Sequence, residues 1–204
     1  MMFWAFRWNC RKKPTPILTS KVGSFSGGQC PPFMAKIIMV AGVTHPTQSM
    51  LTLEDIGFAA ARTLLARYQL DLVQVENDQA IPGSFWGECE AGVIGSQVFA
   101  RFDTPVHSLL HEACHLIVLP EEKRLEIHTD ATDSVAEEDA VCVLQAILGD
   151  ELPGVGRERI WADMDEWGYT FRLGSAKAYF ENDANDSFNF LVTRGLINTK
   201  QQLL

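Results

Sequence analysis

The sequence predicts an α+β fold in which a helix and short β-strands precede a helix carrying an HExxH motif, with further helices towards the C-terminus. Residues 70–75 alternate apolar and polar side chains as a strand does, residues 91–102 are a second strand candidate, and both segments precede the motif. The motif itself, residues 111–115 (HEACH), lies in an apolar stretch with helical spacing. Beyond it the apolar residues recur with helical periodicity, so we expect only helices there.

Length and composition limit the classes of protein to which the chain can belong. Its 204 residues, 47% of them hydrophobic, suit one domain with a single core. The net charge is −9 and there is no basic stripe, so we do not expect nucleic acid as a partner. Apolar runs such as residues 37–43 and 116–119 are too short to cross a bilayer, so we expect no membrane association.

The cysteines indicate a reduced setting. There are five, an odd number, at positions 10, 30, 89, 114 and 142, and no two form a CxxC pair. Cys114 and Cys142 fall inside apolar helical patterns, where a free thiol behaves as a small buried hydrophobe. We therefore expect no disulfide framework and a cytoplasmic location.

The first 33 residues differ from the rest of the chain. Residues 1–13 place aromatic side chains before basic ones, the reverse of a secretory signal, and residues 14–33 are rich in Pro, Gly and Ser. We expect residues 1–33 to be a disordered extension, or one that arises from a mis-called start codon. The predicted domain spans residues 34–204.

Capping residues and helix breakers divide the domain further. Thr52 precedes two acids and an apolar helical pattern, Thr104-Pro105 opens the motif helix, and Ser134 with Glu137 matches a capping box. A Gly95-Ser96 turn would make residues 91–102 a hairpin. We expect helices over about 53–68, 105–119, 134–148, 157–167 and 175–192, and loops over 80–87 and 121–133.

The HExxH motif predicts a metal site with hydrolytic chemistry. On a helix, His111 and His115 lie one turn apart on one face, so both imidazoles can bind one zinc ion at the usual Zn–N distance of ~2.0–2.1 Å. Glu112 is offset by one residue and can reach a water on the metal, whose pKa zinc lowers to about 7. We predict one Zn²⁺ held by the two histidines, with Glu112 as the general base. With five histidines in the chain, the motif should arise by chance in under about one such sequence in a hundred; histidines that only pack or face water are the alternative.

A catalytic zinc needs a third protein ligand and one open position. Glu137, Glu138 and Asp139 begin the next predicted helix, where acids also complement the helix dipole. Glu137 is the capping-box acid and Asp139 is one methylene shorter, so we choose Glu138 as the ligand and keep its two neighbours as alternatives.

Three further residues could belong to the site. His107 shares a helical stripe with the two motif histidines but lies about 12 Å along the axis from His115, too far for both to bind one ion. We expect it to be a cleft residue behind the ligands or a surface histidine. His128 is expected to be an exposed loop histidine that could approach the metal, and Tyr169 is a candidate hydrogen-bond donor to a developing oxyanion.

These residues resemble the zincin metallopeptidases whose third ligand is a glutamate, and in particular small zincins of the ImmA/IrrE type. The resemblance rests on HEACH (111–115) and on EEDAVCVLQAIL (137–148), and it covers residues 70–148. It implies a zincin-like domain in which a small sheet lies beside the motif helix and residues 91–102 pair with an extended substrate. The chain departs from that pattern in having HEACHL where HExGH is frequent, and no helix-turn-helix domain is apparent.

The predicted function is therefore a zinc-dependent hydrolase, a metallopeptidase of narrow specificity that acts on a peptide or protein substrate. The alternative is a non-catalytic zinc-binding interaction module on the same fold, and a third is a protein that uses no metal. Glu112 favours the first, because a purely structural metal site has no use for a carboxylate at that offset.

Overall fold

The computed structural model describes residues 49–204 except 86, 88, 130 and 132–133. The predictions made for residues 1–33, for a domain that starts at residue 34 and for the apolar run 37–43 lie outside the described residues. Within them the chain forms helices and a three-stranded sheet, so the predicted α+β class is confirmed.

The sheet has the strand order β1-β3-β2, with β1 at Asp71–Gln74, β2 at Gly92–Ile94 and β3 at Gln97–Ala100. β3 pairs in parallel with β1 and antiparallel with β2. The predicted hairpin is confirmed: Gly95, with a φ of 60°, and Ser96 form the two-residue turn between β2 and β3.

The helix predicted over 53–68 is instead two helices, α1 at Leu53–Ile56 and α2 at Phe58–Ala66. Gly57 separates them with φ 76° and ψ 147°, a backbone conformation that only glycine adopts readily. The predicted cap at Thr52 is present, since its backbone N–H donates to Asp55 Oδ2 at 2.8 Å.

The motif helix α3 spans Val106–Val118, close to its predicted bounds. Pro105 is its N-cap, one position later than predicted, because the Thr104 hydroxyl accepts the backbone N–H of Arg101 at 3.0 Å in the preceding turn. After Pro120, a single helical turn, α4 at Glu121–Arg124, forms where a loop was predicted.

The remaining helices carry the C-terminal part of the core. α5 spans Val135–Gly149 and begins at the predicted cap, where Ser134 Oγ accepts the Glu137 N–H at 3.4 Å. α6 spans Arg157–Trp167 as predicted. The helix predicted over 175–192 is two helices, α7 at Ala176–Asn182 and α8 at Asn185–Thr193, because Asp183 and Ala184 leave helical geometry.

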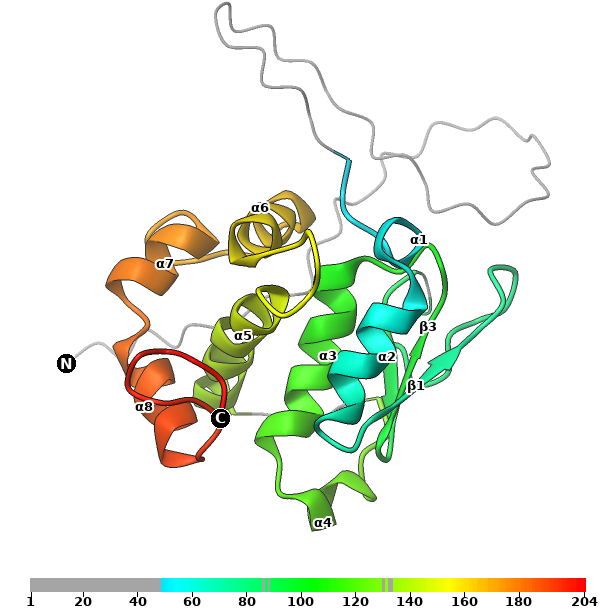
Figure 1. Ribbon diagram of the computed structural model, residues 1–204, viewed down its shortest axis with the longest axis horizontal. Helices are drawn as coiled ribbons and strands as arrows, with labels where there is room; N and C mark the ends of the chain where they lie inside the picture. The colour runs from blue at the N-terminus through cyan, green and yellow to red at the C-terminus, as the bar shows by residue number, and fades with distance from the viewer. Residues whose placement is uncertain (1–48, 86, 88, 130, 132–133) are drawn as a thin grey trace, which may run out of the picture.

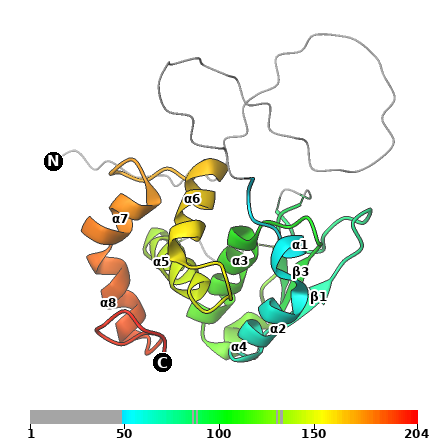
Figure 2. The same cartoon turned by 45° about the horizontal axis from the view of Figure 1, so that its top comes forward.

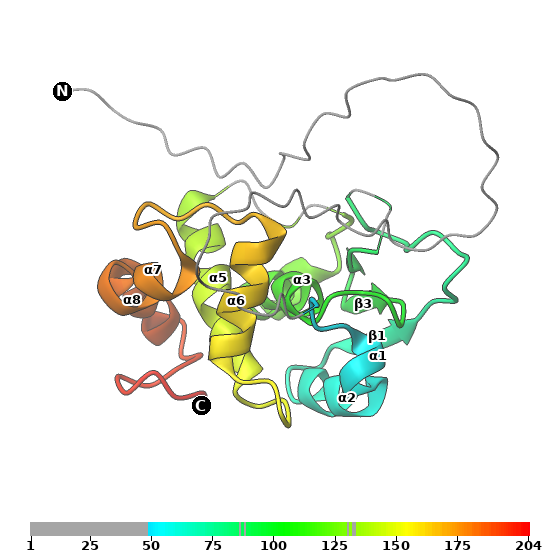
Figure 3. The ribbon, with the colours of Figure 1, turned by 90° about the horizontal axis from the view of Figure 1, so that it is seen from above.

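α3 lies in the middle of the described domain. It packs against α5 on one side and against β2 and β3 on the other, while α2 covers β1 (Figures 1 and 3). α5 also contacts α6 and α8, and α6 reaches α3 (Figure 2). As a result almost every side chain of α3 is buried, the motif histidines included. Among the described residues there is no helix with the length and apolar character needed to cross a bilayer.

The described cysteines differ from one another. Cys114 on α3 and Cys142 on α5 are free thiols in the core, as predicted. Cys89 is disulfide-bonded, so the expectation of reduced thiols throughout is wrong at this position.

Candidate metal centre

His111 and His115 face α5 from adjacent turns of α3, and each is less than 10% exposed. Their Nε2 atoms are 3.1 Å apart, with the rings nearly perpendicular. The i, i+4 spacing therefore brings the two imidazole nitrogens to one point, as the motif predicts.

Glu138 completes the cluster from the first turn of α5. Its Oε2 lies 3.7 Å from His111 Nε2, and its Oε1 lies 3.6 Å from His115 Nε2. Within the described part of the chain, these three residues form the one group of metal-ligand side chains whose ligand atoms converge within 4.8 Å.

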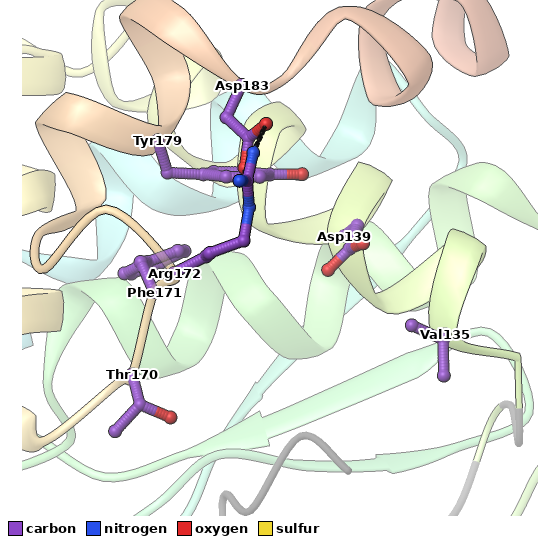
Figure 4. Close-up of a pocket in the computed structure, with 7 residues that line it drawn as sticks. All are labelled: Val135, Asp139, Thr170, Phe171, Arg172, Tyr179 and Asp183. Carbon is purple, nitrogen blue, oxygen red and sulfur yellow. Dashed lines mark hydrogen bonds and ion pairs between the residues drawn. The ribbon is translucent and has the colours of Figure 1, made fainter. Parts of the chain in front are cut away.

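The three consecutive acids that were candidates for the third ligand point in different directions, because each helical residue turns the side chain by about 100°. Glu137 faces away from the histidines and places Oε1 3.5 Å from a guanidinium nitrogen of Arg194, after α8. Asp139 lines a cavity together with Tyr179 of α7 (Figure 4). Of the three, Glu138 is the one that the structure brings to His111 and His115.

The spacing of the three side chains fits a tetrahedral ion. Ligands bound at ~2.0–2.1 Å in tetrahedral geometry are about 3.3 Å from one another. The observed separations of 3.1, 3.6 and 3.7 Å lie on either side of that value, so small side-chain adjustments would let all three bind one ion.

Gln145, two turns further along α5, fixes the protonation of His111. The His111 Nδ1–H donates to Gln145 Oε1 at 2.8 Å, so its Nε2 keeps a lone pair directed at the cluster. Metal-binding histidines commonly donate their second ring N–H in this way. Sequence reasoning missed Gln145, although its spacing of seven residues from Glu138 places both on the same face of α5.

Burial keeps both histidines neutral. Desolvation lowers the pKa of His111 to about 4, with the Gln145 hydrogen bond acting in the opposite direction. Desolvation also lowers the pKa of His115 well below its ordinary value, and proximity to His111 adds to the effect. Neutral imidazoles are the form in which histidines bind zinc.

Glu112 lies on α3 between the two histidines in sequence and is half-buried. It does not join the three-residue cluster, which is what the offset of one residue predicts for a group that acts beside a metal and does not bind it. It is the only acidic residue of α3.

His107 also stays out of the cluster, but it is not a surface histidine. Its side chain is 1% exposed, and its ring lies 5.1 Å from Trp167 and 5.8 Å from Tyr169, measured between centroids. Neither ring nitrogen has a hydrogen-bond partner among the described residues. Burial, with a smaller contribution from His111, lowers its pKa to about 3.

Tyr169 forms an aromatic wall beside the cluster. Its ring meets His111 edge-on, 5.8 Å away between centroids, and stacks on Phe171 at 6.4 Å. Gly168 ends α6 with a φ of 102°, and this left-handed turn lets the following chain fold back over α3. The structure therefore brings Tyr169 next to one of the predicted ligands.

His128 is exposed and lies at the edge of the sheet, where its Nδ1 is 2.8 Å from Thr129 Oγ1. The neighbouring backbone covers β2: Thr129 N–H donates to Val93 O, and Gly95 N–H donates to Ile127 O. The outer backbone groups of Val93 and Gly95 are therefore already hydrogen-bonded within the chain. The expectation that residues 91–102 pair with an extended substrate is wrong at these two residues.

Comparisons with known proteins do not assign the chain to a family: no protein-family model, no curated protein and no solved structure matches it.

Of the three consecutive acids at residues 137–139, only Glu138 should bind the metal. Glu138→Gln should weaken zinc binding by more than about a hundredfold, beyond the 10–100-fold typical of groups that only support a ligand. Glu137→Gln, the matched control, should bind zinc as the wild type does, because Glu137 contacts Arg194 and is not part of the cluster of His111, His115 and Glu138. Competition with a chromophoric chelator measures both affinities. Loss of zinc in Glu137→Gln with retention in Glu138→Gln would show that the third ligand is misassigned.

The buried His107 leads to a second prediction, on acid stability. Its pKa is about 3 in the folded chain against 6.5 ordinarily, so between these pH values the unfolded state binds a proton that the folded state excludes. The free energy of unfolding should therefore decrease as the pH falls below 6.5, by up to about 1.4 kcal/mol per pH unit from this residue.

His107→Phe should remove that contribution, so the zinc-free variant should lose less stability than the zinc-free wild type between about pH 7 and about pH 5. Urea unfolding of the two proteins at each pH tests this. Parallel losses of stability would mean that His107 takes up its proton in the folded state.

Proposed function

We propose that this chain is a zinc-dependent hydrolase, a peptidase of narrow specificity on a zincin-like fold. His111, His115 and Glu138 hold one zinc ion, and Glu112 is the general base. The observation that carries the proposal is the convergence of two neutral imidazole nitrogens and a carboxylate within 3.1–3.7 Å.

The donor set supports zinc in particular. Imidazole nitrogen with carboxylate oxygen suits zinc, whereas an all-oxygen set would suit magnesium or calcium. Among the described residues three side chains converge, which is the number that catalytic zinc sites use while keeping one position open. The placement of α3 between a small sheet and α5 supports the zincin-like part of the proposal.

A bound zinc ion supplies Lewis acidity, lowering the pKa of a coordinated water to about 7 and polarising a carbonyl group. The residues of the chain supply the rest. Gln145 holds His111 in the tautomer that leaves Nε2 free to bind. Glu112 accepts the proton of the attacking water, and passes it to the leaving amine. The low exposure of both histidines keeps bulk water away from the ligands.

Peptide hydrolysis is the reaction that the zinc ligands and Glu112 can support with the fewest further groups, because it needs only a substrate carbonyl, a water and one base. The Tyr169 ring beside His111 gives the centre an aromatic wall on the α6 side. We include its hydroxyl as the candidate donor to the oxyanion.

The second candidate, a non-catalytic zinc-binding module, is favoured by one observation: His111 and His115 are both more than 90% buried. A structural zinc site is closed and needs no base. The two functions therefore differ in what Glu112 does.

The corresponding prediction concerns Glu112→Gln, which keeps the size and polarity of the side chain but removes its basicity. The variant should retain zinc and the melting temperature of the wild type while losing about 10²–10⁴-fold in turnover of peptides. Glu126→Gln, at an exposed position, is the matched control and should cleave as the wild type does.

A peptide library incubated with each zinc-loaded protein and analysed by mass spectrometry provides the measurement. Equal cleavage by wild type and Glu112→Gln would exclude Glu112 as the base. A folded, zinc-loaded wild type that cuts nothing would favour the interaction module.

A further inference from the structure

Two arginines cap the C-terminus of α3, the helix that carries both histidines of the metal centre. The Nε–H of Arg124, on α4, donates to Leu116 O at 2.6 Å. An Nη1–H of Arg194, the C-cap residue of α8, donates to Val118 O at 2.8 Å. The last carbonyl groups of a helix have no N–H partner within it, and a cation beside them also complements the helix dipole. Both arginines therefore fix the end of α3.

Arg194 differs from Arg124 because its guanidinium also contacts the helix that carries Glu138. Its Nη2 lies 3.5 Å from Oε1 of Glu137, in the first turn of α5. A guanidinium presents several N–H donors in a rigid fork, so one side chain can hold two acceptors at once. We call the contacts of Arg194 with Val118 O and Glu137 Oε1 the Arg194 bridge.

The Arg194 side chain is itself held on the α5 side of the bridge. Its Cζ lies 4.9 Å from the centroid of the Phe190 ring, on α8. α8 packs against α5, which lies between α8 and α3 (Figures 1 and 3). The arginine therefore reaches from the α5–α8 pair to the last residue of α3.

The bridge comes next in a series of contacts along the α3–α5 pair. His111 contacts Gln145, and His115 contacts Glu138, so residue numbers rise along α3 as they fall along α5 and the two helices run antiparallel. The α3 end of the bridge is three residues beyond His115, about 4.5 Å along the axis at ~1.5 Å per residue. The metal centre thus lies between two fixed points, the Gln145 hydrogen bond and the Arg194 bridge.

The distances within the cluster leave little room for one helix to slide along the other. The carboxylate oxygens of Glu138 lie 3.7 and 3.6 Å from Nε2 of His111 and His115, close to the separation of about 3.3 Å in a tetrahedral zinc site. Metal–ligand distances hold to within about 0.2 Å, whereas a helix advances ~1.5 Å per residue. A slide of α5 by a fraction of one residue would therefore take Glu138 away from the metal.

We infer that Arg194 is a positioning residue of the metal centre: it ties the C-terminus of α3 to the first turn of α5, and so keeps Glu138 at binding distance from His115. The inference rests on the metal site of the proposed function and adds to it a residue that touches neither metal nor substrate. Arg194 acts through the relative position of the two ligand helices.

The variants that test this are Arg194→Ala, Arg194→Lys and a matched control, Arg67→Ala. Arg67 is also a helix C-cap residue, with its guanidinium near an aromatic ring, that of Tyr68, and paired with an acid, Glu151. Glu151 follows the C-terminus of α5, so the control removes a similar set of contacts from the end of α5 opposite to Glu138.

Three measurements on the full chain distinguish positioning from general stabilisation. Competition with a chromophoric chelator gives the zinc affinity. Co²⁺ in place of zinc gives a visible absorption that is strong in four-coordinate sites and weak in six-coordinate ones, so it reports the geometry of the ligands. The melting temperature of the zinc-free protein gives the effect on the fold alone.

Arg194→Ala should bind zinc about 10–100-fold more weakly than the wild type, the loss typical of groups that orient metal ligands. Its Co²⁺ absorption should fall as water replaces the displaced carboxylate of Glu138. Arg194→Lys should recover most of the affinity and of the absorption, because an ammonium group can still donate to Val118 O. Arg67→Ala should match the wild type in both. Glu137→Gln should do so too, because its amide oxygen still accepts a hydrogen bond from Arg194.

A lower melting temperature in Arg194→Ala with wild-type zinc affinity and Co²⁺ absorption would overturn the inference and leave the metal site intact. Equal losses of affinity in Arg194→Ala and Arg67→Ala would also overturn it, since the effect would then come from general destabilisation. A wild type that binds neither Zn²⁺ nor Co²⁺ would overturn the metal site, and the role of Arg194 with it.

Discussion

The packing of α3 against α5 is the contact on which the candidate site depends. α3 supplies two imidazoles one turn apart, but neither helix alone holds three ligands. Because the two helices pack closely, Glu138 and Gln145 on α5 reach His111 and His115 from the opposite side. β2, β3 and α6 also pack against α3, and each of the two histidines is less than 10% exposed.

That burial sets the electrostatics of the centre. Taking two imidazoles out of water favours their neutral form, and their Nε2 atoms lie 3.1 Å apart next to the side chain of Glu138. A histidine pair that only packs would instead share a proton between the two Nε2 atoms. A divalent cation satisfies all three ligands at once, which is why we favour a metal over a histidine pair that only packs.

The sequence alone was sufficient for the parts of the site that depend on local geometry. The spacing of His111 and His115 on one helix determines that their side chains meet, and the caps at Thr52 and Ser134 located two helix starts. Glu138 could be favoured but not separated from its neighbours, because nearly all of α5 from Ala140 onwards is apolar and buried, and its periodicity does not reveal which face meets α3.

The errors have a common physical origin. The apolar pattern continues through Gly57 and through Asp183, so it does not reveal the local changes of backbone conformation that separate α1 from α2 and α7 from α8. Gln145 resembled an ordinary polar interruption of an apolar helix. His107 was expected at the surface or in a cleft. The sequence did not reveal that Trp167 and Tyr169, at and after the end of α6, pack against its side of α3.

The metal content of the purified full chain, combined with zinc X-ray absorption spectroscopy, tests the central claim most directly. The account predicts close to one zinc per chain, with nitrogen and oxygen ligands at ~2.0–2.1 Å, two of them imidazoles, and no sulfur. His111→Ala and His115→Ala should each lose most of the metal. A folded wild type that binds no transition metal even after zinc is supplied at neutral pH, or a zinc ion bound through sulfur, would contradict it.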